Sequence, residues 1–245
     1  MLSMNKYQLG IVIPTYNESE NIADLLYKIA EEVKIAEIST LVLVMDDNSP
    51  DGTSAIVQDL SSKISSSNFQ VEIKVRPKKM GLASAYIQGF NQIMQRVEFL
   101  QEMDADFSHN PKYLKELVTQ AKLWCDFVIG SRNIPGGGVE GWGPVRNLIS
   151  KLGSLYAKLI LGVNINDFTG GFNLYKAEVF QKLDLNSIKA EGYLFQIEMK
   201  YRAAKLGFKF TEVPILFVDR QKGKSKFNNK IVLEALLGVI RLRFS

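Results

Sequence analysis

Two aspartates near the middle of the chain stand one residue apart, directly after an apolar segment that is typical of a strand. They are Asp104 and Asp106 in the stretch QEMDADFSHNPKYL, residues 101–114. Carboxylates at positions i and i+2 of a strand point to the same side, so both can address one hard divalent cation that also binds diphosphate oxygens and water. The alternative is ordinary turn chemistry after a strand. His109 is either a ligand or base, or a capping or packing group.

Two further polar clusters follow strand-like segments earlier in the chain. PTYNE follows the apolar run 9–14, and DDNSPDGT follows the run 41–47. Pro14, Tyr16 and Glu18 form either a strand-to-helix turn or a shelf for a nucleotide base. A carboxylate of the second cluster either accepts hydrogen bonds from base or ribose, or belongs to a solvated turn with a helix cap. Because open α/β sheets bind ligands outside the carboxyl ends of their strands, we expect the three clusters to converge on one crevice.

The elements that must position these residues alternate in character along the first half of the chain. Strands are expected at 9–14, 41–47, 71–75, 99–104 and 126–131. Helices are expected after each of the first four, with stripes at 22–33 and 82–97, and with Asn17 and Glu20 as a capping box for the first. This alternation predicts an α/β fold with a mainly parallel twisted sheet and helices on both faces.

The second half of the chain has a different pattern. A Gly-rich loop at 131–144 precedes expected helices at 145–161 and around 193–205, a strand at 210–218 and an amphipathic C-terminal helix. We expect a catalytic domain at 1–226 and a C-terminal amphipathic helix at 227–245.

Composition limits the class of protein. With 245 residues, 46% hydrophobic and 23% charged, one globular domain is expected, and a net charge of +4 is too small to indicate nucleic acid as a partner. The single cysteine, Cys125, excludes an intramolecular disulfide and a cysteine-rich zinc site, and we expect it to be buried in a protein of a reducing compartment. No signal-peptide pattern or run of ~18 apolar residues is present, so neither secretion by that route nor a transmembrane anchor is expected.

Ten segments of the chain share a resemblance to one family. In order they are PTYNESEN, DDNSPDGT, GLASAYIQGF, MDADFSHNPKYL, GSRN, GVEGWGPVRNLISKL, DFTGGFNLYK, GYLFQIEM, EVPILFVDR and GKSKF. Together they resemble the dolichol-phosphate mannose synthases of glycosyltransferase family 2, from Gly10 to about Leu242. The resemblance implies a GT-A fold that transfers mannose from GDP-mannose to a polyprenyl (dolichyl) phosphate.

The resemblance also implies roles for individual residues. Asp104 and Asp106 would hold Mg²⁺ or Mn²⁺, and with Ala105 they would bind the diphosphate. Ser108 stands where some relatives have a Gln that helps to bind the cation, so its role as a ligand is in doubt. The residues expected to hold the nucleoside are Pro14, Tyr16, Glu18 and Asp47, with the backbone near Met45. The residues expected to face phosphate groups are Arg132, Arg220 and Lys226.

The chemistry agrees with this resemblance. The acceptor's phosphate monoester carries about 1.5 to 2 negative charges, so its oxygen is a nucleophile without a general base. We expect in-line attack at the anomeric carbon with inversion, while the cation stabilises the departing GDP. The loop from Arg220 to Lys226 either closes over the phosphates, with Gly223 giving mobility, or is a solvated charged loop. Glu198 either positions the sugar or is an exposed helix charge.

A lipid acceptor requires contact with a membrane. The helix at 145–161 and the C-terminal helix either lie in the interface, at the cytosolic face, or pack on the core. A small membrane-spanning partner subunit is another expected contact of the C-terminal helix. Two rival functions stay open at this point: a UDP-glucose-dependent polyprenyl-phosphate glucosyltransferase and a non-catalytic nucleotide-binding module.

Overall fold

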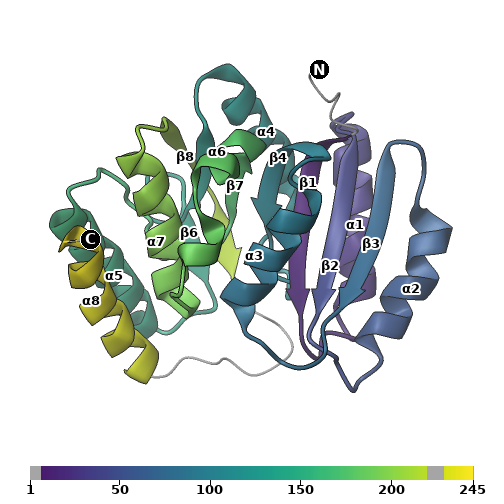
Figure 1. Ribbon diagram of the computed structural model, residues 1–245, viewed down its shortest axis with the longest axis horizontal. Coiled ribbons are helices and arrows are strands. Elements are labelled where there is room, and N and C mark those ends of the chain that lie inside the picture. The colour runs from purple at the N-terminus through teal and green to yellow at the C-terminus, as the bar shows by residue number, and fades with distance from the viewer. Residues whose placement is uncertain (1–6, 220–228, 245) are drawn as a thin grey trace.

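The computed structural model describes residues 7–219 and 229–244, which fold around a central sheet (Figure 1). The strands are β1 (Tyr7–Thr15), β2 (Thr40–Asp46), β3 (Phe69–Val75), β4 (Val97–Glu102), β5 (Phe127–Ser131), β6 (Gly138–Glu140), β7 (Asn173–Lys176), β8 (Phe210–Pro214) and β9 (Leu216–Val218). The helices are α1 (Ile22–Ile35), α2 (Thr53–Ile64), α3 (Leu82–Ile93), α4 (Leu114–Leu123), α5 (Pro144–Leu161), α6 (Ala177–Lys182), α7 (Gly192–Lys205) and α8 (Asn229–Phe244). Short 3₁₀ turns occupy Pro111–Tyr113 and Leu185–Ser187.

In the described part of the chain, seven strands form one sheet in the order β3-β2-β1-β4-β7-β5-β8. Strand β7 runs antiparallel to both of its neighbours, β4 and β5, and the other neighbouring strands are parallel. Strands β6 and β9 pair separately. The mainly parallel sheet expected from the sequence is therefore confirmed. The strands β6 and β7 were missed, and the single strand expected at 210–218 is divided into β8 and β9 at Ile215.

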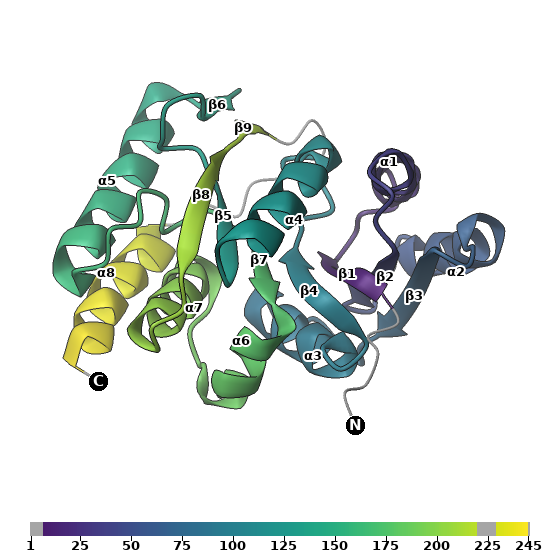
Figure 2. The same cartoon turned by 90° about the horizontal axis from the view of Figure 1, so that it is seen from above.

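Helices cover both faces of the sheet (Figure 2). On one face α1, α2 and α4 pack against Leu9, Ile11 and Ile13 of β1, while on the other α3, α6 and α7 join a second apolar cluster that contains Val12. Because β1 is covered on both faces, it reads as a continuous apolar run rather than an alternating one. Each fully buried side chain of this size contributes roughly 1.5 to 3 kcal/mol through burial of apolar surface. Cys125 is buried, as expected.

Two details near the site differ from the sequence prediction. The predicted capping box is wrong: α1 begins at Ile22 after Asn21, and Asn17 adopts a left-handed conformation in the preceding loop. Val97, expected to continue the stripe of α3, is the first residue of β4. The strand expected at 99–104 therefore lies two residues earlier, and β4 ends at Glu102, two residues before Asp104.

Helices α5 and α8 lie side by side at one end of the molecule, next to α7 (Figures 1 and 2). Val239 of α8 is buried in the core, whereas α5 keeps an apolar stripe in solvent. The members of this stripe are 49% to 72% exposed and are Val145, Leu148, Leu152, Leu155 and Leu159. No helix within residues 7–219 and 229–244 is long and apolar enough to cross a bilayer.

Candidate functional site

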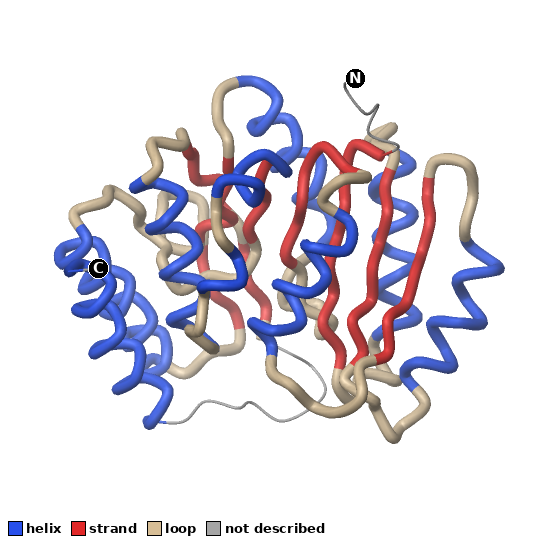
Figure 3. Tube along the Cα trace, in the orientation of Figure 1, coloured by secondary structure: helices blue, strands red, loops and turns tan. Residues whose placement is uncertain are grey.

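The loops after β1 and β2 meet at the carboxyl edge of the sheet (Figure 3) and are fastened to each other. The backbone N–H of Glu18 donates to Thr53 Oγ1 at 3.0 Å, and that of Ser19 donates to Asp51 Oδ2 at 3.0 Å. Burial raises the pKa of Asp51, but hydrogen bonds from Thr53 and Ser19 outweigh it and lower the pKa to about 2. Asp51 is therefore the ionised anchor that holds the two loops together.

The loops after β1, β2 and β4 each contain a non-glycine residue with positive φ. They are Asn17 (61°) after β1, Asn48 (57°) after β2 and Phe107 (62°) after β4. The left-handed region is tolerated by Asn but is strained for a bulky residue such as Phe. Strain at Phe107 persists only where the surroundings enforce it, and Phe107 lies between Asp106 and Ser108 in the loop that contains the acidic pair.

The residues expected to hold a nucleoside lie together at the ends of β1 and β2. Pro14 pairs with Met45 across the two strands. The Met45 side chain is buried and faces Gly89 of α3, so a contact of Met45 with the nucleoside would be made by its backbone at the end of β2. The ring of Tyr16 lies under the ammonium of Lys79, 4.1 Å from the ring centre.

Asp47 has a partner that sequence reasoning missed. Its Oδ1 accepts from Arg76 Nε at 2.5 Å, and its Oδ2 accepts from the backbone N–H of Met80 at 3.1 Å. Both members of the ion pair are buried. Arg76 is itself held by Ser84 Oγ and the carbonyl of Gly81, so the carboxylate of Asp47 is fixed in one orientation.

The acidic pair lies in the loop after β4. Oδ1 of Asp104 accepts from the hydroxyl of Tyr86 at 3.1 Å. Oδ1 of Asp106 accepts from Ser108, from its hydroxyl at 2.5 Å and its backbone N–H at 3.1 Å. The Ser108 hydroxyl therefore orients the Asp106 carboxylate.

The donor set of this loop fits Mg²⁺ or Mn²⁺. Two carboxylates supply the hard oxygen ligands that such cations prefer. Among the described residues no cluster of three or more His, Cys, Asp or Glu side chains is placed to hold a metal. A cation at Asp104 and Asp106 therefore needs further oxygens from a ligand and from water, as Mg²⁺ sites commonly do.

His109 is hydrogen-bonded to the backbone of the acidic loop. Its Nδ1 accepts from the backbone N–H of Asp104 at 3.0 Å, and its ring stacks on Phe172 with centroids 4.9 Å apart. Burial lowers the pKa of His109 below its ordinary value. A neutral imidazole that accepts at Nδ1 is in the packing and positioning role, one of the two interpretations that the sequence left open.

Arg132 is held by residues that sequence reasoning missed. Its Nε and Nη2 donate to the two carboxylate oxygens of Asp167, each at 2.7 Å, and Nη2 also donates to Thr169 Oγ1 at 2.9 Å. Burial raises the pKa of Asp167, but the charge of Arg132 outweighs it and keeps that pKa well below its usual range. The contact of Arg132 with a phosphate stays a prediction.

The remaining sequence candidates are Glu198, Arg220 and Lys226. Glu198 is buried and forms an ion pair with Arg202, so its interpretation as an exposed helix charge is wrong. Burial raises its pKa, with Arg202 opposing the shift. Arg220, Lys226 and the loop between them lie outside the described residues.

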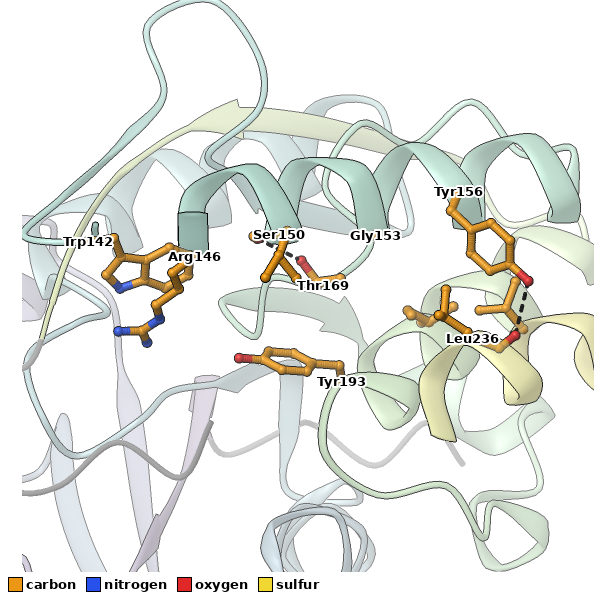
Figure 4. A pocket seen from close by; sticks show the side chains of 11 residues that line it. Trp142, Arg146, Ser150, Gly153, Tyr156, Thr169, Tyr193 and Leu236 are labelled. Carbon is orange, nitrogen blue, oxygen red and sulfur yellow. Dashed lines mark hydrogen bonds between the residues drawn. The ribbon is translucent and has the colours of Figure 1, made fainter. Parts of the chain in front are cut away.

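An apolar cavity of about 50 Å³ lies between α5, α7 and α8 (Figure 4). Residues along it include Trp142, Arg146, Tyr156, Thr169, Tyr193 and Leu236. In the described part of the chain, Trp142 Nε1 and Arg146 Nε are buried without a hydrogen-bond acceptor. Figure 4 shows these two side chains together at one end, and a hydrogen bond from Tyr156 to the carbonyl of Leu236 at the other.

A second, acidic hollow of about 350 Å³ lies beside the cavity. Its carboxylates are Glu20, Asp24, Asp106 and Asp219. Arg146 connects the two, because its Nη1 donates to Asp219 at 3.0 and 3.1 Å while its guanidinium lies 4.0 Å from the ring centre of Trp142. The sequence contains one sign of this arrangement of Trp142 and Arg146, because the segment GWGPVR places an aromatic and a cation at the start of an amphipathic helix.

Comparison with known proteins shows a consistent likeness in sequence. Residues 10–184 match the model of glycosyl transferase family 2. The undecaprenyl-phosphate mannosyltransferase of Micrococcus luteus is 42% identical over 231 residues, which cover 94% of this chain and 91% of that protein. The polyprenol monophosphomannose synthase of Mycolicibacterium smegmatis is 40% identical over 230 residues, which cover 94% of this chain and 84% of that protein.

Solved structures share the fold at lower identity. Glucosyl-3-phosphoglycerate synthase from Mycobacterium tuberculosis, in complex with Mn²⁺, uridine diphosphate and glucosyl-3-phosphoglycerate, has a TM-score of 0.68 and 16% identity, covering 97% of this chain and 80% of that one. Mannosyl-3-phosphoglycerate synthase from Rubrobacter xylanophilus has a TM-score of 0.67 and 18% identity, covering 96% and 72%. These likenesses confirm the expected GT-A fold.

Proposed function

Because the chain belongs to glycosyltransferase family 2, we propose that it transfers mannose from GDP-mannose to a polyprenyl phosphate, with inversion. The names of the two relatives support the sugar and the lipid class of the acceptor. The donor nucleotide, the inversion and the metal dependence are the finer parts of the proposal. They rest on the residues at the carboxyl edge of the sheet.

One observation carries the assignment of two substrates. The ion pair of Arg146 with Asp219 stands where the acidic hollow meets the apolar cavity. The hollow contains Asp106, which belongs to the predicted diphosphate site. The cavity is almost wholly apolar, which suits the hydrocarbon next to a lipid phosphate. Donor and acceptor would thus meet beside Arg146.

On the donor side, the chain's own residues bind and orient the nucleotide. Lys79 lies over one face of the Tyr16 ring, so a base would stack on the other face, and Asp47, fixed by Arg76, would offer an oriented carboxylate to hydrogen-bond donors of the base or ribose. Asp104 and Asp106 would hold Mg²⁺ or Mn²⁺, which when bound neutralises charge on the departing diphosphate. A structural neighbour crystallised with Mn²⁺ supports this choice of ion.

On the acceptor side, the phosphate would lie at the mouth of the cavity. Arg146 Nε and Trp142 Nε1 are buried donors without an acceptor in the described part of the chain, and a phosphate oxygen would supply one. The acceptor oxygen attacks the anomeric carbon, a new C–O bond forms, and the bond to the diphosphate breaks on the opposite face. No general base is needed, which agrees with a buried His109 whose Nδ1 is occupied.

The lipid acceptor also implies a membrane surface. The exposed stripe of α5, from Val145 to Leu159, would lie in the interface with the end of α8 beside it, and the basic Lys151 would meet headgroups. The cytosolic face and a small membrane-spanning partner remain predictions.

A transfer assay with purified protein tests the function. Radiolabelled GDP-mannose, a short polyprenyl phosphate in detergent micelles and Mg²⁺ should give a labelled lipid, and its anomeric configuration by NMR tests inversion. UDP-glucose is supplied in a parallel reaction. Transfer of glucose alone would favour the glucosyltransferase, and GDP binding without transfer of either sugar would favour the non-catalytic module.

A further inference from the structure

Lys200 is a fully buried ammonium inside α7. Its Nζ donates three hydrogen bonds, to the carbonyl oxygens of Asp167 at 3.0 Å, Phe168 at 3.0 Å and Gly170 at 2.7 Å. A lysine ammonium has three N–H donors, so all of them are used. Each acceptor belongs to the same short segment of chain, residues 167–171.

The segment 167–171 contains no helix or strand. The carboxylate of Asp167 closes it internally, because Oδ1 accepts from the backbone N–H of Gly170 at 2.9 Å. A buried loop without a backbone ladder leaves its carbonyl groups in need of donors. Lys200 supplies those donors from the neighbouring helix, so its ammonium fixes the shape of the loop.

The loop in turn fixes two polar groups of the candidate site. Asp167 receives three hydrogen bonds from Arg132, from its backbone N–H, Nε and Nη2, at 2.7 to 2.9 Å. Thr169 Oγ1 accepts from Arg132 Nη2 and lies 3.3 Å from Ser150 Oγ in the wall of the apolar cavity. A shift of the loop therefore moves the Arg132 guanidinium and the Thr169 hydroxyl together.

Stability alone is a weak reason for such a group. Removing an ammonium from water has a large free-energy cost, and an apolar residue of similar volume is often as stabilising. Burial lowers the pKa of Lys200, while the carboxylates of Asp167 and Glu102 raise it. The positive charge is therefore partly compensated, but its burial still costs free energy. The three hydrogen bonds from its Nζ to one loop indicate that Lys200 fixes the shape of that loop.

We propose that Lys200 is a positioning residue that shapes the loop 167–171 and so fixes Arg132 and Thr169 for use of the phosphate-bearing acceptor. The choice of substrate rests on the proposed function above. Lys200 acts only through the loop, because its three donors are already occupied.

The test compares Lys200→Met and Lys200→Ala with Lys205→Met, an exposed lysine on the same helix. For the Lys200 variants kcat/KM for polyprenyl phosphate should fall about 10- to 100-fold, the cost typical of a catalytic group misplaced by about 1 Å. Affinity for GDP should be unchanged, and backbone amides of 167–171 should exchange hydrogen faster. Lys205→Met should alter none of these quantities.

Chemical rescue separates positioning from general loss of structure. Methylammonium added to Lys200→Ala can refill the space with N–H donors, so it should restore both transfer and protection of the loop amides. Tetramethylammonium has no N–H donor and should restore neither.

Three results would overturn the inference. They are full transfer by Lys200→Met, equal rescue by the two cations, and variants that fold neither with nor without methylammonium. If the unmodified protein transfers no mannose, the proposed function fails instead, and the exchange of the loop amides with its rescue still decides whether Lys200 shapes the loop.

Discussion

Arg132 and Asp167 form a two-point ion pair in the interior, with Nε and Nη2 each 2.7 Å from a different carboxylate oxygen. The side chains are 4% and 0% exposed, so neither charge has access to bulk water. The pair links the end of β5 to the loop before β7, two segments that are 35 residues apart. It is therefore a tertiary constraint next to the site as well as a source of charge.

Asp167→Asn should destabilise the fold by about 3 to 5 kcal/mol, because it leaves the buried guanidinium without its counter-charge. Urea denaturation measures this as a shift in the midpoint. Asp59→Asn is the matched control, since it removes the carboxylate of an exposed pair with Lys63, for which little or no loss of stability is expected. Equal losses in the two variants would contradict a buried, compensated pair.

Asp106→Asn should lower transfer by ~100-fold or more, because the predicted cation loses a carboxylate beside the departing diphosphate. Initial rates with saturating GDP-mannose and Mg²⁺ measure this, and circular dichroism verifies the fold. Asp24→Asn serves as the control, since its carboxylate lies in the same hollow but on α1. Chelation should abolish transfer and added Mn²⁺ should restore it. A chelated enzyme of unchanged rate would remove the metal from the proposal.

The acidic loop and most of the parallel sheet could be predicted because their signals are local. β1 is an unbroken apolar run, and Asp104 and Asp106 follow β4 within four residues of its end. Strand β7 could not be predicted in this way. It has four residues, and its place between β4 and β5 depends on partners far along the chain.

The residues that orient the site were missed for the same reason. Asp47 meets Arg76 across 29 positions, and Lys200 meets the loop at Asp167 across 33. A lone Arg or Lys in an amphipathic helix or turn is normally solvated, so composition and spacing favour the wrong environment for both. Only the folded chain shows that each is buried against a carboxylate or carbonyl.

The pH dependence of stability should contain a contribution from Asp51. Its pKa in the folded protein is about 2, against 3.8 for an unperturbed side chain. A carboxyl group whose folded pKa is depressed stabilises the fold above its unfolded pKa, and this contribution disappears as pH falls from about 4 toward 2. The melting temperatures of the wild type and Asp51→Asn should therefore differ above pH 4 and converge near pH 2. Thr53→Val, which removes one donor, should move the convergence to higher pH.

The exposed stripe of α5 should bind lipid vesicles. Leu152 and Leu155 are 53% and 49% exposed, and a leucine fully transferred from water contributes about 1.5 to 3 kcal/mol. Replacing both with Ser should lower partitioning onto vesicles with anionic lipid by at least about tenfold. Each leucine would lose at least half of this transfer free energy, and the two losses add. Sedimentation with sucrose-loaded vesicles measures the bound fraction.

Two other leucines provide a matched control for this experiment. Leu123 at the end of α4 and Leu206 after α7 are 56% and 54% exposed, so their double replacement with Ser removes the same apolar surface away from α5. Vesicle binding should stay at the wild-type level in that variant, and neither pair should alter the free energy of unfolding by more than about 0.5 kcal/mol per site, as is usual for surface positions. Equal loss of binding in both variants would show general apolar adhesion, and the interfacial role of α5 would then be wrong.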